Sequence, residues 1–229
     1  MSHETQHYRP GTHPRGEDTR RRLVETATEI FAIHGYEGAT TRMLAERAGV
    51  NLPAIQYYFG SKEGLYRAVS EHIIEHIERH MSATAERVRA ALAGPAPPRR
   101  EVLRLLDAVL DVFAAMVLGE QHSESRKLFI ARAEVERMAA IEPLHESMLQ
   151  QVLRPTAALV ARLAGRPADD EQVLLRTIML LGQVTIFCNK PSRRALGSSE
   201  FSAEQVGRVQ ALMREHTAAI FRSAKGAKP

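Results

Sequence analysis

Residues 41–62 read TRMLAERAGVNLPAIQYYFGSK, and the order of residue types predicts two short helices joined by a tight turn. The first helix ends at Gly49, since glycine adopts a positive φ without steric strain. Asn51 is expected to cap the second helix. Pro53 suits its first turn, where a missing amide costs no hydrogen bond. This length and turn chemistry are typical of a helix-turn-helix.

Outside this stretch, apolar residues recur at steps of three and four, and strand-like alternation is nearly absent, so the sequence predicts an all-α protein. A first helix is expected to begin near Asp18 or Thr19 and to stop at Gly35. A long amphipathic helix follows over residues 62–92. The GPAPP linker at residues 94–98 then interrupts the helical pattern, because prolines break helices. Further helices are expected at about 99–118, 123–139, 143–164, 170–188 and 202–222, with loops at 165–169 and 189–201.

Composition narrows the class of protein. The chain has 229 residues, of which 44% are hydrophobic and 25% charged, as in soluble globular proteins. Its N-terminus is polar, and no run of about 18 apolar residues is visible, so we expect a cytoplasmic protein that spans no membrane. Cys188 is the single cysteine, which rules out an intramolecular disulfide. The basic excess lies in residues 190–229, with eight Lys and Arg against three Asp and Glu, so net charge locates no nucleic-acid site.

The second short helix is expected to be a recognition helix that enters DNA. The Gln56 amide can pair with an adenine edge, and the Tyr57 phenol can meet a phosphate or a base. Thr41 and Lys62 stand at helix starts, where side chains and free amides bind phosphate. Tyr58 is expected mainly to pack, although its side of the helix stays open. The residues predicted to contact DNA are Thr41, Arg42, Asn51, Pro53, Ala54, Gln56, Tyr57, Tyr58 and Lys62.

Three motifs carry a resemblance to a known family. A helix ending F-A-x-x-G-Y is followed by T-T-x-x-L-A-x-x-A-G-V and then Y-Y-F-G-S-K-E-G-L-Y. This combination resembles the DNA-binding domain of TetR-family transcriptional regulators over residues 19 to about 73. Many family members have serine where Asn51 stands and an aromatic where Gln56 stands. The N-x-x-A-I-x-Y-Y-F form and the run LRPTAALVARLAGRPADDEQVLLRTIMLLGQVTIF resemble the branch with a CecR-like C-terminal domain, over roughly residues 100–222.

The resemblance implies a dimeric repressor that a small-molecule inducer releases from a palindromic double-stranded DNA operator. It also implies an all-α architecture: an N-terminal three-helix domain with the helix-turn-helix, and a larger helical domain for ligand binding and dimerisation. The expected boundaries are a disordered tail at 1–16, the DNA-binding domain at 17–64, the regulatory and dimerisation domain at 65–223, and a C-terminal tail at 224–229.

The helices near 170–188 and 202–222 are the expected homodimer surface. The first of them is apolar on nearly every side, which exceeds what one buried stripe requires. A central core helix is the alternative interpretation of the same pattern.

A small-molecule effector of unknown identity would need a pocket connected to the long helix. Met and Phe at helical spacing are often plain core, so each candidate has that alternative. Arg132 and His122 are possible polar anchors. The candidates are Phe113, Met116, His122, Phe129, Arg132, Met138, His145, Met148 and Leu149.

The sequence leaves two alternative classes of protein, a metal-dependent hydrolase and a helical protein-interaction adaptor. The histidines at positions 72, 76 and 80 are the one candidate set of metal ligands, but no further ligand is evident from the sequence. No catalytic or phosphate-binding motif is present. We therefore expect no enzyme activity, no metal and no cofactor.

Overall fold

The computed structural model describes residues 14–119, 123–136, 138–197 and 201–223, and over these ranges the chain is helical without strands. This confirms the predicted all-α class. The α-helices are α1 (Pro14–Gly38), α2 (Thr41–Ala48), α3 (Pro53–Phe59), α4 (Lys62–Ala93), α5 (Arg99–Leu118), α6 (Ser123–Val135), α7 (Glu142–Met148), α8 (Arg154–Ala164), α9 (Glu171–Thr185), α10 (Lys190–Ala195) and α11 (Ala203–Ser223). Short 3-10 turns lie at Ala139–Ile141 and Ile186–Cys188, and a π-helical segment lies at Leu149–Leu153.

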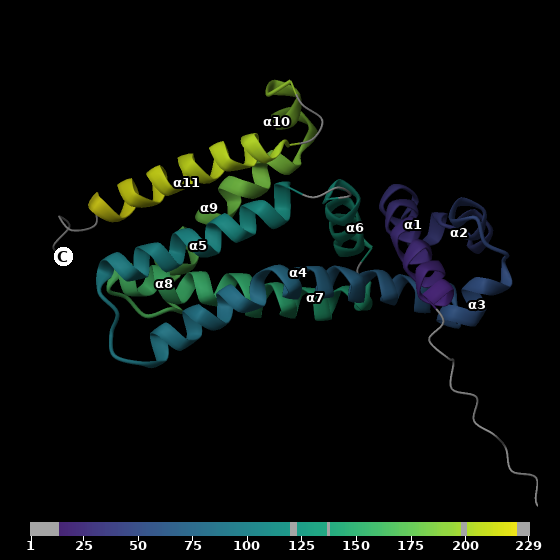
Figure 1. The fold of residues 1–229 in the computed structure, drawn as a ribbon, viewed down its shortest axis with the longest axis horizontal. Coiled ribbons are helices and arrows are strands. Elements are labelled where there is room, and N and C mark those ends of the chain that lie inside the picture. Colours follow the sequence, from purple (N-terminus) through teal and green to yellow (C-terminus); the bar gives the residue numbers. More distant parts are fainter. Residues whose placement is uncertain (1–13, 120–122, 137, 198–200, 224–229) are drawn as a thin grey trace, which may run out of the picture.

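Helix α4 connects the two ends of an elongated molecule (Figure 1). Helices α1, α2 and α3 form one end, and α4 runs from them toward the other end. There α5, α7 and α8 lie along α4, while α9, α10 and α11 form an upper layer. The buried apolar residues nevertheless form one cluster that extends from α1 to α11, and α6 packs against α1. The division at residues 64 and 65 therefore remains a prediction.

Local residue chemistry explains where the first helices begin and end. The Thr40 hydroxyl accepts a hydrogen bond from the Met43 amide at 3.2 Å and caps α2, and Gly49 ends α2 with φ 64°. Gly35 breaks α1 with φ 73° and ψ 178°, at the residue where the sequence predicted the stop. Helix α1 begins at Pro14, earlier than the cap predicted at Asp18 or Thr19, so residues 14–16 of the predicted tail are helical. Residues 1–13 and 224–229 of the predicted tails lie outside the described residues.

Two segments add detail to the sequence-based expectations. Pro155 is expected to interrupt the helix over 143–164, and a π-helical segment lies just before this proline, which lacks the amide that would bond the carbonyl four residues earlier. The segment predicted as a loop at 189–201 contains α10. The Asn189 side chain caps α10 by accepting from the Ser192 amide at 3.1 Å. The loop prediction was wrong there because it relied on the Gly- and Ser-rich composition of the segment and did not take this local cap into account.

Candidate nucleic-acid interface

A tight turn sets the angle between α2 and α3. The Gly49 amide donates to the Glu46 carbonyl at 3.2 Å, and the Val50 amide donates to the Ala45 carbonyl at 3.0 Å. These bonds satisfy carbonyls that the end of α2 would otherwise leave without partners. Ile55 is buried and anchors α3 on its inner side. The predicted helix-turn-helix is therefore present, with the outer side of α3 directed to solvent.

Asn51 does not cap α3 as predicted. Leu52 occupies the cap position in a helical conformation, and no side chain caps this helix. The Ala54 amide instead donates to the backbone carbonyl of Asn51 at 3.0 Å, while Pro53 occupies the first turn as predicted. The cap prediction was wrong because a backbone carbonyl satisfies the amide. The exposed Asn51 side chain thus presents its amide group, a donor and an acceptor, to solvent.

The outer side of α3 exposes chemistry suited to base edges. Tyr57 is 67% exposed and Leu52 is 52% exposed, which is unusual for side chains of this size. Gln56 and Pro53 are exposed, and Ala54 is half-buried. Apolar groups can contact thymine methyls, and the Gln56 amide can bond an adenine edge. The exposed side of α3 therefore carries both kinds of group that read a major groove.

Tyr58 is half-buried, which answers the question of its side. Its ring lies 4.9 Å from the Tyr57 ring and 6.3 Å from the Phe59 ring, measured between centroids. Its hydroxyl approaches Gly16 at the start of α1. The ring therefore packs between α3 and α1, at the edge of the candidate DNA surface.

A hollow of about 500 Å³ lies between the start of α1 and α3. Its lining residues are Thr19, Arg22, Val50, Asn51, Pro53, Ala54, Tyr57 and Tyr58. Thr19 and Arg22 are absent from the residues that the sequence predicts to contact DNA. The sequence instead offers Arg20 and Arg21 of the same helix as backbone contacts, since only tertiary packing shows which residues of α1 lie beside the recognition helix. The neighbouring arginines are engaged elsewhere: Arg21 pairs with Asp18 at 2.8 Å, and Arg20 lies over the Phe59 ring.

Thr41 and Arg42 are the first two residues of α2. Thr41 is half-buried at the first position of the helix. The Arg42 guanidinium is exposed and pairs with Glu46 of the same helix, with 2.7 Å between Nε and Oε1. Such an exposed pair contributes little stability, so the guanidinium can exchange its carboxylate for a phosphate.

Lys62 differs most from its predicted role. Its ammonium donates to the Tyr36 carbonyl at 2.9 Å and to the Ala39 carbonyl at 3.1 Å. The same Nζ lies 4.3 Å from the centroid of the Tyr36 ring. Sequence reasoning expected this ammonium to meet phosphate. In the structure it instead fastens the connection between α1 and α2 to the start of α4.

The predicted ligand-binding residues divide among several places. Phe113 and Met116 are buried in the core of α5, and Met138, Met148 and Leu149 are half-buried. His145 is exposed on α7 beside Glu134, and His122 lies outside the described residues.

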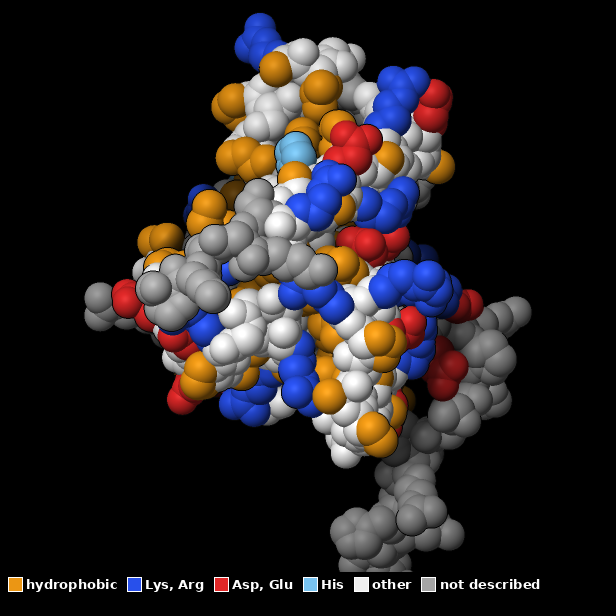
Figure 2. Space-filling view, turned by 90° about the vertical axis from the view of Figure 1, so that its left-hand side faces the viewer, with side chains coloured by type: hydrophobic (Ala, Val, Ile, Leu, Met, Phe, Trp, Pro, Cys, Tyr) orange, Lys and Arg blue, Asp and Glu red, His pale blue; other side chains and the backbone are white. Residues whose placement is uncertain are grey.

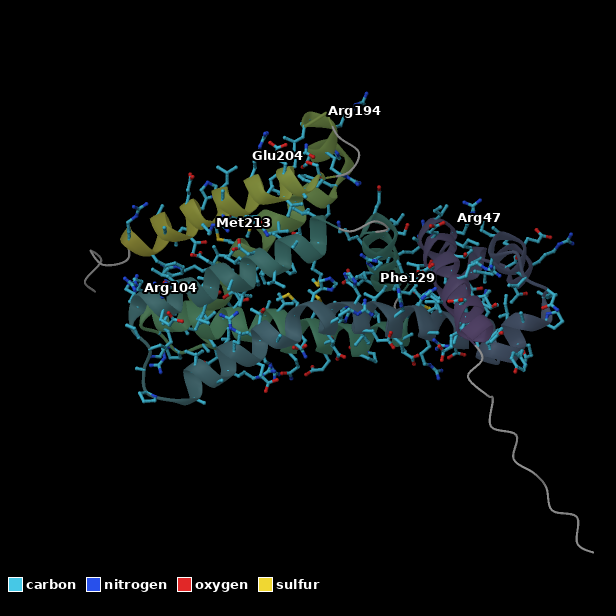
Figure 3. The ribbon with its side chains drawn as sticks, in the orientation of Figure 1. Arg47, Arg104, Phe129, Arg194, Glu204 and Met213 are labelled. Carbon is cyan, nitrogen blue, oxygen red and sulfur yellow. The ribbon has the colours of Figure 1, made fainter. Side chains whose placement is uncertain are left out.

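Two of these candidates lie where α6 meets the DNA-binding end, as the position of Phe129 in Figure 3 shows. The ring of Phe129 lies 4.8 Å from the ring of Tyr66. The Arg132 guanidinium approaches Gly35 of α1. Both side chains thus join the two parts of the molecule.

The histidine row on α4 has structural contacts. His76 is buried, its ring lies 4.4 Å from the His80 ring, and the His80 Nδ1 lies 2.8 Å from the His76 carbonyl oxygen. Burial lowers the pKa of His72, so it favours the neutral ring. Within the described part of the chain, no group of three or more His, Cys, Asp or Glu could hold a metal ion.

Apolar side chains remain at the surface of the upper layer. Figure 2 shows hydrophobic side chains gathered in the upper part of that view. On α9, Val173, Leu180 and Val184 face inward, yet Met179 on the same helix is 69% exposed. The other exposed apolar residues of α9 and α11 are Leu175, Ile178, Leu212 and Ile220. Helix α9 is thus a core helix on one side and an uncovered apolar surface on the other.

Within the ranges that the structure describes, one segment, Glu171–Cys188, is long and apolar enough to cross a membrane by length and composition, with a mean hydropathy of 1.3. Only 28% of it is buried inside the chain. It coincides with α9 and the following turn, so its exposed residues belong to the apolar surface described above.

Comparisons with known proteins match both parts of the fold. The family described as bacterial regulatory proteins, tetR family, matches residues 23–69, and the C-terminal domain of the HTH-type transcriptional dual regulator CecR matches residues 100–223. CecR of Shigella flexneri is 31% identical over 175 residues, which cover 76% of this chain and 77% of that protein. The transcriptional repressor AcnR of Corynebacterium glutamicum is 45% identical over 53 residues, or 23% of this chain and 28% of AcnR.

Solved structures share the fold. A TetR-like regulator from Rhodococcus sp. RHA1 aligns with a TM-score of 0.57 at 19% identity, covering 91% of this chain and 97% of that one. AmtR of Mycobacterium smegmatis aligns with a TM-score of 0.56 at 18% identity, covering 98% of this chain and all of AmtR.

These matches are to transcriptional regulators, which agrees with the expectation that the chain is not an enzyme, and they give no support to a hydrolase or an adaptor. The chain belongs to the TetR family of bacterial transcriptional regulators, in the branch with a CecR-type C-terminal domain, and is a DNA-binding regulator of transcription.

Proposed function

We propose that the protein is a homodimeric repressor that binds a palindromic operator and leaves it when a small molecule binds the helical domain. The observation that carries the proposal is that one chain exposes two surfaces suited to partners. They are the recognition surface of α3 and the apolar surface of α9 and α11. The repressor AcnR, matched over the DNA-binding segment, supports the sign of regulation. A cytoplasmic location follows, because the operator is there.

Burial of exposed apolar side chains would drive formation of the dimer. Leu175, Ile178 and Met179 of α9 lie exposed with Leu212 and Ile220 of α11, and burying such a surface against a second copy removes apolar area from water. A palindromic operator then matches the twofold symmetry. Two recognition helices reach successive major grooves about 34 Å apart.

Selection of bound fragments from random double-stranded DNA by the purified protein tests this proposal. A palindromic consensus with half-sites about one helical turn apart is the expected result. Failure to enrich any sequence would contradict the DNA-binding role. An asymmetric consensus would contradict the symmetric dimer on its operator.

Replacing Gln56 with alanine is expected to relax base preference at one position in each half-site. The side chain is exposed on α3, so its amide is available to an adenine edge, and loss of such a contact costs about 1–3 kcal/mol. Affinity for the selected operator and for its single-base variants measures the effect. Gln172→Ala, at an exposed glutamine on α9, is the matched control. Equal discrimination by Gln56→Ala and the parent would remove Gln56 from the reading surface.

Arg22→Ala is expected to weaken binding to all DNA sequences alike. Arg22 lines the hollow between α1 and α3, and an arginine beside the recognition helix can bind a phosphate of the DNA backbone. The slope of log affinity against log salt should fall in magnitude by about 1 for each arginine lost from a phosphate. Arg208→Ala on α11, far from α3, should leave the slope unchanged. An unchanged slope in Arg22→Ala would place this residue outside the interface.

A further inference from the structure

Tyr36 is held on both sides by helices of the regulatory part. It follows the break of α1 at Gly35. Its amide donates to the Glu136 carboxylate, which lies just past the end of α6, at 3.0 Å. Its carbonyl accepts from the ammonium of Lys62, the first residue of α4, at 2.9 Å. Opposite charges from α6 and α4 therefore hold the two peptide groups that flank one residue.

Gly35 provides the room for this contact. Its φ of 73° favours glycine, and a Cβ at this position would overlap the Glu136 carboxylate. The same missing side chain lets the Arg132 guanidinium approach, since its Nη1 would lie 3.0 Å from that Cβ. The break at Gly35 thus interrupts α1 and also receives the end of α6.

The ring of Tyr36 makes further contacts at the junction where the break of α1 meets α4 and the end of α6. Its centroid lies 5.3 Å from that of Tyr66 on α4 and 6.2 Å from that of Phe31 on α1. Tyr66 in turn contacts Phe129 of α6. Because α2 begins at Thr41, a few residues beyond Tyr36, a displacement of this junction reaches the helix-turn-helix directly.

We propose that Glu136 is a positioning residue that sets the orientation of the helix-turn-helix relative to α6, by holding the Tyr36 amide at the glycine break. The residue itself touches no DNA. The inference rests on the proposed dimer on a palindromic operator, since it explains how the helical domain fixes the separation of two recognition helices. Loss of the carboxylate leaves the junction held by Lys62 and the ring contacts, so the orientation becomes less defined.

Glu136→Ala tests this role with three measurements. Hydrogen exchange should show lost protection at the Tyr36 amide. Operator affinity should fall about three- to tenfold, the effect of one modest hydrogen bond. Pulsed electron spin resonance between nitroxides at position 47, introduced as Arg47→Cys in a Cys188→Ser background, should show a broader distribution of distances in the dimer. Position 47 is exposed on α2 (Figure 3).

Glu134→Ala is the matched control, because Glu134 is an exposed carboxylate at the end of α6, two residues before Glu136, and it lies 3.4 Å from His145 of α7. It should leave all three measurements unchanged. Glu136→Gln keeps an acceptor for the Tyr36 amide and should restore most of the affinity. A loss of amide protection with unchanged affinity and distances would overturn the proposal, since the contact would then be structural only. Failure of the parent protein to bind any DNA would instead contradict the proposed function, and the distance measurement would still test the positioning role.

Discussion

Replacing Met179 with aspartate is expected to convert the proposed dimer into monomers and to lower operator affinity by about 10²–10⁴-fold. Met179 is 69% exposed on α9, so the carboxylate remains hydrated in a single chain, where surface substitutions change stability by about 0.5 kcal/mol or less. In the dimer the same carboxylate would be buried against apolar side chains without a partner, which costs several kcal/mol. Separation of the two DNA-binding ends then removes the gain from simultaneous binding of two half-sites.

Light scattering after size exclusion measures the mass, and a fluorescence titration with the selected operator measures the affinity. Val135→Asp is the matched control, since Val135 is 83% exposed on α6, away from α9 and α11. It should remain dimeric, and it is the control for the mass measurement only, because it adjoins Glu136. If Met179→Asp stayed dimeric with full affinity, the dimer would use another surface.

Replacing Lys62 with methionine is expected to destabilise the fold by about 2–3 kcal/mol. The ammonium supplies two charge-assisted hydrogen bonds to backbone carbonyls and lies over the Tyr36 ring, and methionine keeps the length of the side chain but none of these contacts. The Tyr36 and Ala39 carbonyls would then lose their ammonium partner. Thermal unfolding followed by circular dichroism measures the loss.

Arg67→Met is the control that removes a positive charge from α4 without removing the hydrogen bonds that Lys62 donates. Arg67 is an exposed cation of α4 whose pair with Glu63 is long, at 3.6 Å, so its loss should change stability by about 0.5 kcal/mol or less. If Lys62 served mainly as a phosphate ligand, Lys62→Met would unfold like the parent and would only reduce the salt dependence of binding. Equal stability of Lys62→Met and Arg67→Met would therefore contradict the fastening role.

Features with a local cause were predictable from the sequence. Gly35 and Gly49 mark helix ends because their backbone conformation is costly for other residues, and the start of α2 after Thr40 follows from ordinary capping. The helix-turn-helix and the long α4 follow from the same rules. The comparisons confirm the family that the motifs around Gly49 and Tyr57 indicated.

Features that depend on a distant partner were not predictable. Lys62 follows a helix cap and looks available to solvent, but its carbonyl partners lie 23 and 26 residues away. Glu136 is separated from Tyr36 by 100 residues, and no local pattern connects them. Phe129 and Arg132 have the residue types of a ligand pocket, yet their place against the DNA-binding end depends on the docking of α6 on α1. Composition gives the kind of side chain, whereas tertiary packing decides what it meets.

The wide turn at Leu149–Leu153 changes what one continuous stretch of helix can contact. Helix α7 packs on α4, whereas α8 packs mainly on α5 and α9. An uninterrupted α-helix advances about 100° per residue, so its apolar stripe keeps one direction along its length. The π-helical turn holds extra backbone, which offsets the stripe of α8 from that of α7 by about one residue's rotation. The continuous helical segment from α7 to α8 can thereby pack on two sets of helices that lie in different directions, without a loop between α7 and α8.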